Sequence, residues 1–432
     1  MGTHDVLFVG GNILRRRCMT RAALSSGTVA ALIAAVIVLG LSAVQGDTAV
    51  ATAAPTSTTT STVLPTSTTT TAAPSSTTTV PSSAQGIDGW SLPEDMIVPN
   101  GTANAGESTP EEAVAGADTV AAAPVPEPVR IPRPNCANNV GSPTNRTAPF
   151  TGLSASIPSS MPAVVVKVSN NDSRSRASLI GLDQADIVFE ERIEASATRF
   201  FAVFHSSMPP NVGPVRSGRT TDIQITQNLN RPVFGYSGSN QGVARQIKFA
   251  ADNGLLVPYI NTDSAPFARD SRFRAPDNLF VDPAALGGCG GGGNPTAIFS
   301  YGPTPSSAQA ASSVSLSARS PYRFDWNGSA WVRSQDGSTH TTRDGVALAP
   351  TNVVVLFVPY VQSQIDAASV DAETIGSGSA WVFRDGTATI GNWRRDRGHE
   401  QYTLTDSSGA GVTLAPGQTW VVLAPAGSAS WN

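Results

Sequence analysis

Charged residues of both signs gather between positions 186 and 219, where their spacing could create an anion-binding site. Three acids lie in the run ADIVFEE, and one arginine begins the next apolar run. Two more arginines flank Ser217-Gly218 in NVGPVRSGR, just before a predicted helix, where backbone amides and the helix dipole favour an anion. The set could therefore hold a phosphate or a carboxylate. Its candidate residues are Asp186, Glu190, Arg199, Arg216 and Arg219.

The acids of ADIVFEE divide between the two faces of their strand, because side chains alternate along a strand. Asp186 and Glu190 share one face with Val188, whereas Glu191 shares the other with Phe189. On either face an acid could meet an arginine of a neighbouring strand. A structural Arg–Glu network that pins the sheet is therefore the alternative to a ligand site.

Signatures of familiar catalytic sites are missing from the sequence. There is no His-Glu-x-x-His zinc helix, and Gly235–Ser239 departs from the Gly-x-Ser-x-Gly nucleophile elbow at its last position. His205 is interpreted as a packed or surface histidine rather than a general base. Gly287–Gly293 is interpreted as a flexible junction, because Asn294-Pro295 follows it instead of the Gly-Lys-Ser/Thr of a phosphate loop. We expect neither a metal nor a cofactor.

Apolar runs bounded by turn residues predict the elements that position these side chains. Strands are expected at Val164–Ser169, Ala185–Glu191, Thr198–His205 and Pro232–Ser237, and helices at Thr220–Leu229 and Asn240–Ala251. Asn240 is expected to be the N-cap of the second helix, and Gly254 its stop.

Beyond Tyr322 the sequence is a run of strands and tight turns. Asn327-Gly328, Asp336-Gly337 and Asp385-Gly386 each separate two strand-like runs, which is a strong hairpin signal. Asn352–Val358 predicts a central apolar strand, and Thr419–Ala424 predicts the last strand. The expected fold is α+β: a mixed-sheet N-terminal part with helices, followed by a mainly antiparallel β C-terminal part.

The first 129 residues differ in composition from the rest. No charged residue lies between Arg21 and Asp47, and this stretch is long enough for about one bilayer crossing. Arginines before it and acids after it predict the N-terminus inside and the remainder outside. A cleaved signal peptide fits as well, because Ala51-Thr52-Ala53 offers small residues for cleavage. Residues 52–83 are mostly Thr, Ser, Pro and Ala, which predicts a disordered tether that continues through an acidic stretch.

The net charge of each segment limits the classes of partner that fit this protein, and the cysteine content bears on its cellular compartment. The net charge is +3 over residues 1–46, −9 over residues 47–129 and +2 over the remainder. A nearly neutral folded part excludes an electrostatic nucleic-acid binder. Cys136 and Cys289 are the cysteines that follow the hydrophobic segment, and in an oxidising compartment their simplest interpretation is a disulfide. A lone reactive thiol is the alternative.

Six motifs occur in a fixed order along residues 162–424. They are VVVKVSNNDSRSRASLIGLDQADIVFEE, TRFFAVFHSS, NVGPVRSGR, FARDSRFRAPDNLFV, GSGSAWVFRDGTATIGNW and LAPGQTWVVLAP. Together they resemble the YerB-like family of bacterial envelope lipoproteins, whose members have an N-terminal and a C-terminal part and no assigned biochemical activity. The resemblance therefore implies an architecture and a place in the envelope, and no reaction.

The resemblance also implies a set of recurring polar positions, and two departures from the family. The positions are Asp186, Glu190, Arg199, Arg216, Arg219 and Asn278, with Arg384 and Trp393 in the second part. Family members commonly have a histidine where this chain has Asp277, so any role of that histidine is lost or altered here. Members are often lipid-anchored, whereas this chain has no cysteine suitably placed after its hydrophobic segment.

These observations predict an ordered series of segments. They are a basic cytoplasmic tail (1–21), a transmembrane anchor or signal (22–46), a disordered linker (47–129), an N-terminal domain (130–286), a Gly-rich connector (287–320) and a C-terminal β domain (321–432). We expect a single-pass membrane protein with an extracytoplasmic domain, or a form secreted after signal cleavage. The functional hypothesis is an envelope-associated module that binds a cell-wall component or an envelope protein. The alternative is a hydrolase or transferase that acts on an envelope polymer through an Arg/acid site.

Overall fold

The computed structural model describes residues 140–261 and 266–432. The predicted tail, hydrophobic segment and linker lie outside these residues, as does Cys136. The membrane segment and the Cys136–Cys289 disulfide therefore stay predictions. Within the described ranges, no helix combines the length and the apolar character that a membrane crossing requires.

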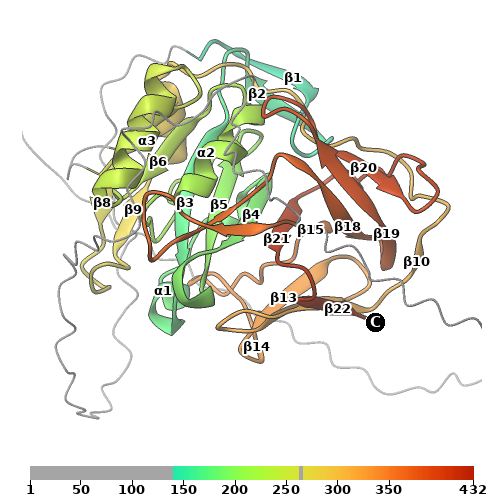
Figure 1. Cartoon of the computed structure of the whole chain (residues 1–432). Helices are drawn as coiled ribbons and strands as arrows, with labels where there is room; N and C mark the ends of the chain where they lie inside the picture. Colours follow the sequence, from blue (N-terminus) through green and yellow to red (C-terminus); the bar gives the residue numbers. More distant parts are fainter. Residues whose placement is uncertain (1–139, 262–265) are drawn as a thin grey trace, which may run out of the picture. The chain divides into compact units, whose positions relative to one another are not determined.

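The largest element is a mixed sheet of 11 strands (Figure 1). The strands are ordered β10-β19-β18-β15-β21-β4-β5-β3-β6-β7, and β20 pairs with β19. Their bounds are β3 (Val164–Asn170), β4 (Ile187–Arg192), β5 (Thr198–Phe204), β6 (Val233–Tyr236), β7 (Val257–Ile260), β10 (Gln309–Ala310), β15 (Asn352–Phe357), β18 (Gly376–Arg384), β19 (Thr387–Arg395), β20 (Thr403–Asp406) and β21 (Thr419–Ala424). Each strand predicted between residues 164 and 237 is confirmed, as are those at 352–358 and 419–424.

Strand β21 joins the two parts of the sequence into one sheet. It pairs in parallel with β15 on one side and with β4 on the other, where Val421 lies opposite Phe189. The expectation of a mainly antiparallel C-terminal part is right for β15, β18, β19 and β20. The expectation does not hold for β21. After β15 the chain passes through β18, β19 and β20, and β21 then returns beside β15 and runs parallel to it.

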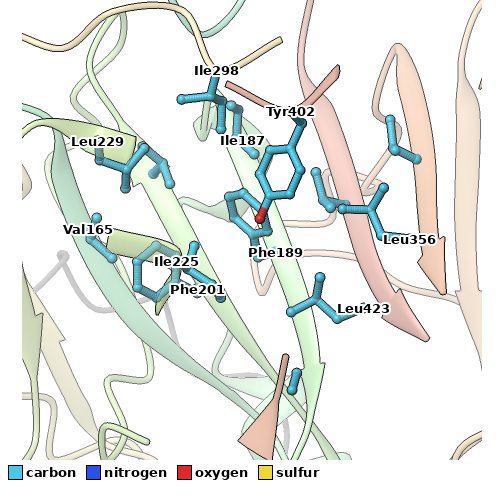
Figure 2. Packing of buried hydrophobic residues seen from close by; sticks show 14 of the residues in the cluster. Val165, Ile187, Phe189, Phe201, Ile225, Leu229, Ile298, Leu356, Tyr402 and Leu423 are labelled. Carbon is cyan, nitrogen blue, oxygen red and sulfur yellow. The ribbon is translucent and has the colours of Figure 1, made fainter. Parts of the chain in front are cut away.

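The central strands are covered on both faces, which explains why β3, β5 and β21 are buried at every position. On one face, Val165, Phe189 and Phe201 pack against Ile225 and Leu229 (Figure 2). The alternate residues of the same strands form a second apolar cluster with residues of a smaller sheet. The alternation predicted for β4 therefore separates two cores.

Helices are few, and only about 13% of the described residues are helical. They are α1 (Ser173–Ala177), α2 (Thr220–Thr226), α3 (Gln241–Asp252) and α4 (Pro283–Gly288), with the 3-10 turns η3 (Leu182–Gln184), η4 (Glu194–Ser196) and η5 (Gln227–Leu229). Both predicted helices are confirmed, the first as α2 continued by η5. Asn240 caps α3 as predicted, because its Oδ1 accepts the backbone N–H of Val243 at 2.9 Å. The fold is largely β, with a mixed sheet and few helices.

The smaller sheet has five strands in the order β14-β13-β12-β11-β22. They are β11 (Ser313–Leu316), β12 (Tyr322–Trp326), β13 (Trp331–Gln335), β14 (Ser338–Thr339) and β22 (Ala429–Trp431). All three predicted hairpins are confirmed, as β12–β13, β13–β14 and β18–β19. Asp385 and Gly386 have φ values of 50° and 69°, which a tight type I′ turn requires.

Three further hairpins and the glycine-rich run complete the described chain. The hairpins are β1 (Pro143–Thr147) with β2 (Ser154–Pro158), β8 (Phe267–Arg269) with β9 (Leu279–Val281), and β16 (Tyr360–Gln362) with β17 (Val370–Ala372). In the glycine-rich run, a Cβ on Gly292 would lie 2.8 Å from the carbonyl oxygen of Arg231. One on Gly293 would lie 2.6 Å from that of Asn230. Close packing of the backbone therefore explains these glycines, where the sequence indicated a flexible junction.

Candidate functional site

The segment 214–218 brings Arg216 to the carboxyl ends of the parallel strands β3 and β6. The backbone N–H of Arg216 donates to the carbonyl of Lys167 at 2.8 Å, and that of Ser237 donates to the carbonyl of Arg216 at 3.0 Å. The segment therefore lies between the ends of the two strands. Ligands of open mixed and parallel sheets commonly bind beyond such ends, where the strands separate.

A buried ion cluster lies beside this segment, on the same face of the sheet as Phe189 and Phe201. Lys167 donates from Nζ to Glu191, and to Asp222 Oδ1 at 2.5 Å. All three side chains are fully buried. Burial raises the pKa of Glu191 to about 7, although the charge of Lys167 acts in the opposite direction. One cation thus serves two carboxylates.

Arg219 is held by a bidentate ion pair. Its Nε and Nη2 donate to the two carboxylate oxygens of Glu194 at 2.7 and 2.8 Å. Burial acts to raise the pKa of Glu194, but hydrogen bonds and charge from Arg219, with a hydrogen bond from Ser369, outweigh it and hold that pKa at about 2. The charge of Arg219 is therefore compensated within the protein.

Arg199 and Arg216 differ from Arg219 because neither forms an ion pair with a described carboxylate. Arg199 is 5% exposed, and its Nη1 donates to the carbonyl of Ser217 at 3.0 Å. Burial lowers the pKa of Arg199 to about 9, and the charges of Arg219 and Arg216 add to the decrease. Two arginines thus converge here without an ion pair, although the charges of nearby acids, Asp277 for Arg216 and Glu191 for Arg199, favour their protonated forms.

Several buried polar atoms around these arginines have no hydrogen-bond partner within residues 140–261 and 266–432. They are Ser169 Oγ, Glu191 Oε2, Arg199 Nε, Arg216 Nε, Ser239 Oγ and Asp277 Oδ1, and we call these six residues the arginine site. Arg199 on β5 lies directly opposite Ser169 on β3 and opposite Glu191 on β4. Because buried polar atoms almost always have a partner in folded proteins, this cluster requires water or a ligand.

The hairpin β16–β17 borders this region and comes from the C-terminal part of the chain. Ser369 Oγ donates to Glu194 Oε1 at 2.6 Å, and Thr220 Oγ1 donates to Asp371. The capping residue Asn240 donates from Nδ2 to Asp366 at 2.6 Å. Both parts of the chain therefore build the surroundings of the arginine site.

Glu190 lies on the other face of β4, in a separate network. Its Oε1 accepts from Arg333 Nη2 and from Thr198 Oγ1, each at 2.8 Å, and its Oε2 accepts from Trp420 Nε1 at 2.9 Å. The Arg333 guanidinium also lies 4.6 Å from the ring centroid of Tyr322. Glu190 thus fits the structural interpretation, an Arg–Glu network that pins the smaller sheet to the large one.

Asp186 and Asn278 also lie apart from the three arginines. Asp186 precedes β4, at the end opposite Glu191, and accepts the backbone N–H of Ser206 at 2.8 Å. Burial raises the pKa of Asp186 to about 6, although hydrogen bonds from Ser206 lower it. Asn278 Oδ1 accepts from Arg269 Nη1 at 2.9 Å in the β8–β9 hairpin. Its neighbour Asp277 is the residue that belongs to the arginine site.

The remaining predicted positions make contacts with the backbone or are packed. Arg384 donates from Nη1 to the carbonyls of Gly302 and Thr413 at 2.8 and 3.1 Å. Trp393 Nε1 donates to the carbonyl of Phe357 at 3.0 Å. His205 is 3% exposed, and burial lowers its pKa to about 4, in agreement with a packed histidine.

Four residues of these networks were not predicted from the sequence: Lys167, Asp222, Ser239 and Arg333. A signal existed for Lys167, because a lysine within the apolar run VVVKVS must find an acid if the strand is buried. Asp222 had the appearance of an ordinary acid in the first turn of a helix. Arg333 gave no local signal, since its partner Glu190 lies 143 residues away.

Comparisons with known proteins agree with this fold and with its division in two. The N-terminal domain of a protein of unknown function, DUF3048, matches residues 150–290, and the DUF3048 C-terminal domain matches residues 312–421. The YerB protein of Bacillus subtilis (strain 168), a candidate lipoprotein, is 26% identical over 296 residues, which cover 64% of this chain and 86% of that protein.

The crystal structure of the YerB protein from Bacillus subtilis has the same fold. It matches with a TM-score of 0.58 at 23% identity, over 66% of this chain and 99% of that chain. The two matched regions together span more than half of the 432 residues, in the order that the YerB-like resemblance predicted. The chain therefore belongs to the DUF3048 family.

Proposed function

We propose that the chain is an extracytoplasmic binding module of the cell envelope, and that it recognises an anionic group of a cell-wall component or envelope protein at the arginine site. A contrast among its cations carries the proposal. Lys167, Arg219 and Arg333 each contact a carboxylate, whereas Arg199 and Arg216 form no ion pair with any described residue. Because a buried cation without an ion pair is costly, an anion from outside would stabilise Arg199, beside which the partly exposed Arg216 lies.

The envelope location is supported by the relative and by the N-terminal composition. YerB of Bacillus subtilis is described as a candidate lipoprotein, and lipoproteins are anchored at a membrane surface. In this chain, an uncharged stretch between Arg21 and Asp47 would serve either as a single-pass anchor or as a cleaved signal. In both cases the arginine site lies outside the cytoplasm, where envelope polymers and proteins are its available ligands.

The placement of the acids favours binding over catalysis. A hydrolase or transferase that used the predicted acids would need Asp186 or Glu190 to reach the same ligand as the arginines. Asp186 lies at the other end of β4 and is bonded to Ser206, and Glu190 faces the opposite core. The nearby Glu191 is bonded to Lys167 through one of its oxygens. We therefore propose no reaction.

The test uses the purified full chain, with thermal shift and co-sedimentation against peptidoglycan fragments, anionic wall glycopolymers and envelope extracts. We expect an anionic component to stabilise the protein, and Arg216→Ala to abolish this effect. Arg323→Ala is the matched control, because Arg323 pairs with Asp325 on the smaller sheet and is 46% exposed. Equal binding by Arg216→Ala would contradict the proposal. Chemical change of the bound polymer would favour the enzymatic alternative.

A further inference from the structure

The unpartnered atoms of the arginine site are of two opposite kinds. Arg199 Nε and Arg216 Nε can only donate a hydrogen bond. Glu191 Oε2 and Asp277 Oδ1 are carboxylate oxygens, which accept hydrogen bonds when ionised. A simple anion would satisfy the arginines but would be repelled by the carboxylates. The site therefore calls for a ligand that supplies acceptors and donors together.

The two kinds of atom are interleaved in the structure. Arg199 has Glu191 opposite it on one neighbouring strand and Ser169 opposite it on the other. Arg216 interacts electrostatically with Asp277, whose negative charge favours the protonated guanidinium. A ligand that reaches either arginine therefore lies beside a carboxylate or a hydroxyl.

Asp277 is the second acceptor of the site, and the side chain of Ser169 lies close enough to act on the pKa of its carboxyl. Asp277 is 6% exposed and lies in the turn between β8 and β9, where its backbone N–H donates to the carbonyl of Arg274 at 3.0 Å. Its Oδ1 accepts no hydrogen bond from the residues that the structure describes. Glu191, in contrast, accepts from Lys167 through its other oxygen. A hydroxyl donor from a ligand would satisfy Asp277 at low cost, because the charge is already buried.

We propose that the arginine site takes a phosphorylated sugar or polyol, with the phosphate on Arg199 and Arg216 and a neighbouring hydroxyl donated to Asp277. This inference rests on the proposed function and names the ligand class for the same site. It makes Asp277 a residue that determines specificity. Phosphate alone and sugar alone each satisfy one half of the site.

The first test is titration calorimetry of the full chain with inorganic phosphate, glycerol 3-phosphate, glucose 6-phosphate and glucose. We expect the two phosphate esters to bind roughly tenfold more tightly than inorganic phosphate, since a hydrogen bond to a charged group contributes about that factor. Glucose should not bind. Glycerophosphoglycerol is a phosphodiester and represents a polymer linkage. Comparing its affinity with that of glycerol 3-phosphate shows whether the site prefers a phosphodiester or a phosphate monoester. Equal affinity for inorganic phosphate and both esters would overturn the inference.

The second test uses Asp277→Asn, which keeps the shape of the side chain and removes its charge. We expect about tenfold weaker binding of glycerol 3-phosphate, and unchanged or tighter binding of inorganic phosphate because a repulsive charge is gone. Asp325→Asn on the smaller sheet is the matched control and should alter neither affinity. Equal weakening of both ligands by Asp277→Asn would show a structural role and overturn the inference. Unfolding midpoints of both variants report whether they fold.

The outcomes separate this inference from the proposed function. Arg216-dependent binding of inorganic phosphate with no gain from hydroxyls leaves anion recognition standing and removes the polyol. Arg216-dependent binding of a wall polymer without binding of any small phosphate likewise removes only the polyol. If ordered water fills the site, no probe and no polymer binds, and both proposals fail.

Discussion

Glu190 and Glu191 are neighbours on β4 and lie on opposite faces of the sheet. Buried charges are paired differently on these two faces. Both oxygens of Glu190 accept hydrogen bonds from the protein, and its charge is paired with that of Arg333. On the face of Glu191, Lys167 serves two carboxylates while Arg199 and Arg216 have no ion pair among the described residues. Buried charges that are fully paired within the protein are typical of structural ion pairs. Buried charges that lack a partner are typical of binding sites.

The difference follows from what covers each face. On the Glu190 side, β13 of the smaller sheet supplies Arg333, whose guanidinium is fully buried among aromatic rings. On the Glu191 side, loops and short helix ends meet, and Arg216 and Ser239 are partly exposed. The smaller sheet thus gives Glu190 a counter-charge, whereas the loop junction gives Arg199 and Arg216 no ion pair among the described residues.

The largest expected effect is on the Glu190 face. Glu190→Ala should lower the free energy of unfolding by about 3–5 kcal/mol, because Arg333 would remain buried without a counter-charge. Denaturant unfolding followed by tryptophan fluorescence measures it. Replacing both partners, Glu190→Leu with Arg333→Met, should recover most of the loss. If Glu190→Ala alone lowered the free energy of unfolding by less than about 1 kcal/mol, the Glu190–Arg333 pair would not be a structural link between the two sheets.

Lys167→Met should lower the free energy of unfolding somewhat less, by about 3 kcal/mol at pH 7.5. The reason is that Glu191 and Asp222 would face each other without a cation. The loss should shrink at pH 5. Burial raises the pKa of Glu191, so the carboxyl takes up a proton there and the repulsion disappears. Unfolding measured at the two pH values checks this. An equal loss at both would contradict the shared-cation arrangement.

Arg199→Met should separate stability from binding. Because Arg199 has no ion pair to lose, its replacement should change the free energy of unfolding by no more than about 1 kcal/mol, in either direction. Binding of an anionic envelope component should be lost. Thermal shift with and without that component measures both. A large decrease in the free energy of unfolding would show that Arg199, like Arg333, has a structural role.

The smallest effect concerns pH at the border of the arginine site. Burial, with the charge of Asp366, raises the pKa of Asp371 to about 7 from an ordinary value of 3.8. The folded state therefore holds a proton that the unfolded chain releases, so this contribution to stability is complete below pH 3.8 and is lost as the pH rises through 7. Asp371→Asn should flatten the decline between pH 5 and 8, by on the order of 1 kcal/mol. An unchanged slope would show that Asp371 does not hold this proton.

Local patterns predicted most of the elements and, as candidate site residues, two of the six residues of the arginine site. The apolar runs predicted β3, β5, β15 and β21, and the Asp-Gly and Asn-Gly pairs predicted three hairpins. Of the predicted site residues, Arg199 and Arg216 belong to the arginine site and Arg219 lies beside it. Asp186, Glu190 and Asn278 were grouped with them by closeness in sequence, and the fold places them elsewhere.

The sequence by itself determined the strands, the hairpin turns, the capping of α3 by Asn240 and the alternation of Glu190 and Glu191, because each depends on residues within a few positions. Only the tertiary structure decided that β21 pairs with β4, and that Arg333 rather than a nearby arginine neutralises Glu190. The same holds for Asp277, which meets Arg216 across a separate hairpin. A buried charge needs a partner in space, and strand pairing over more than 200 residues sets which one it finds.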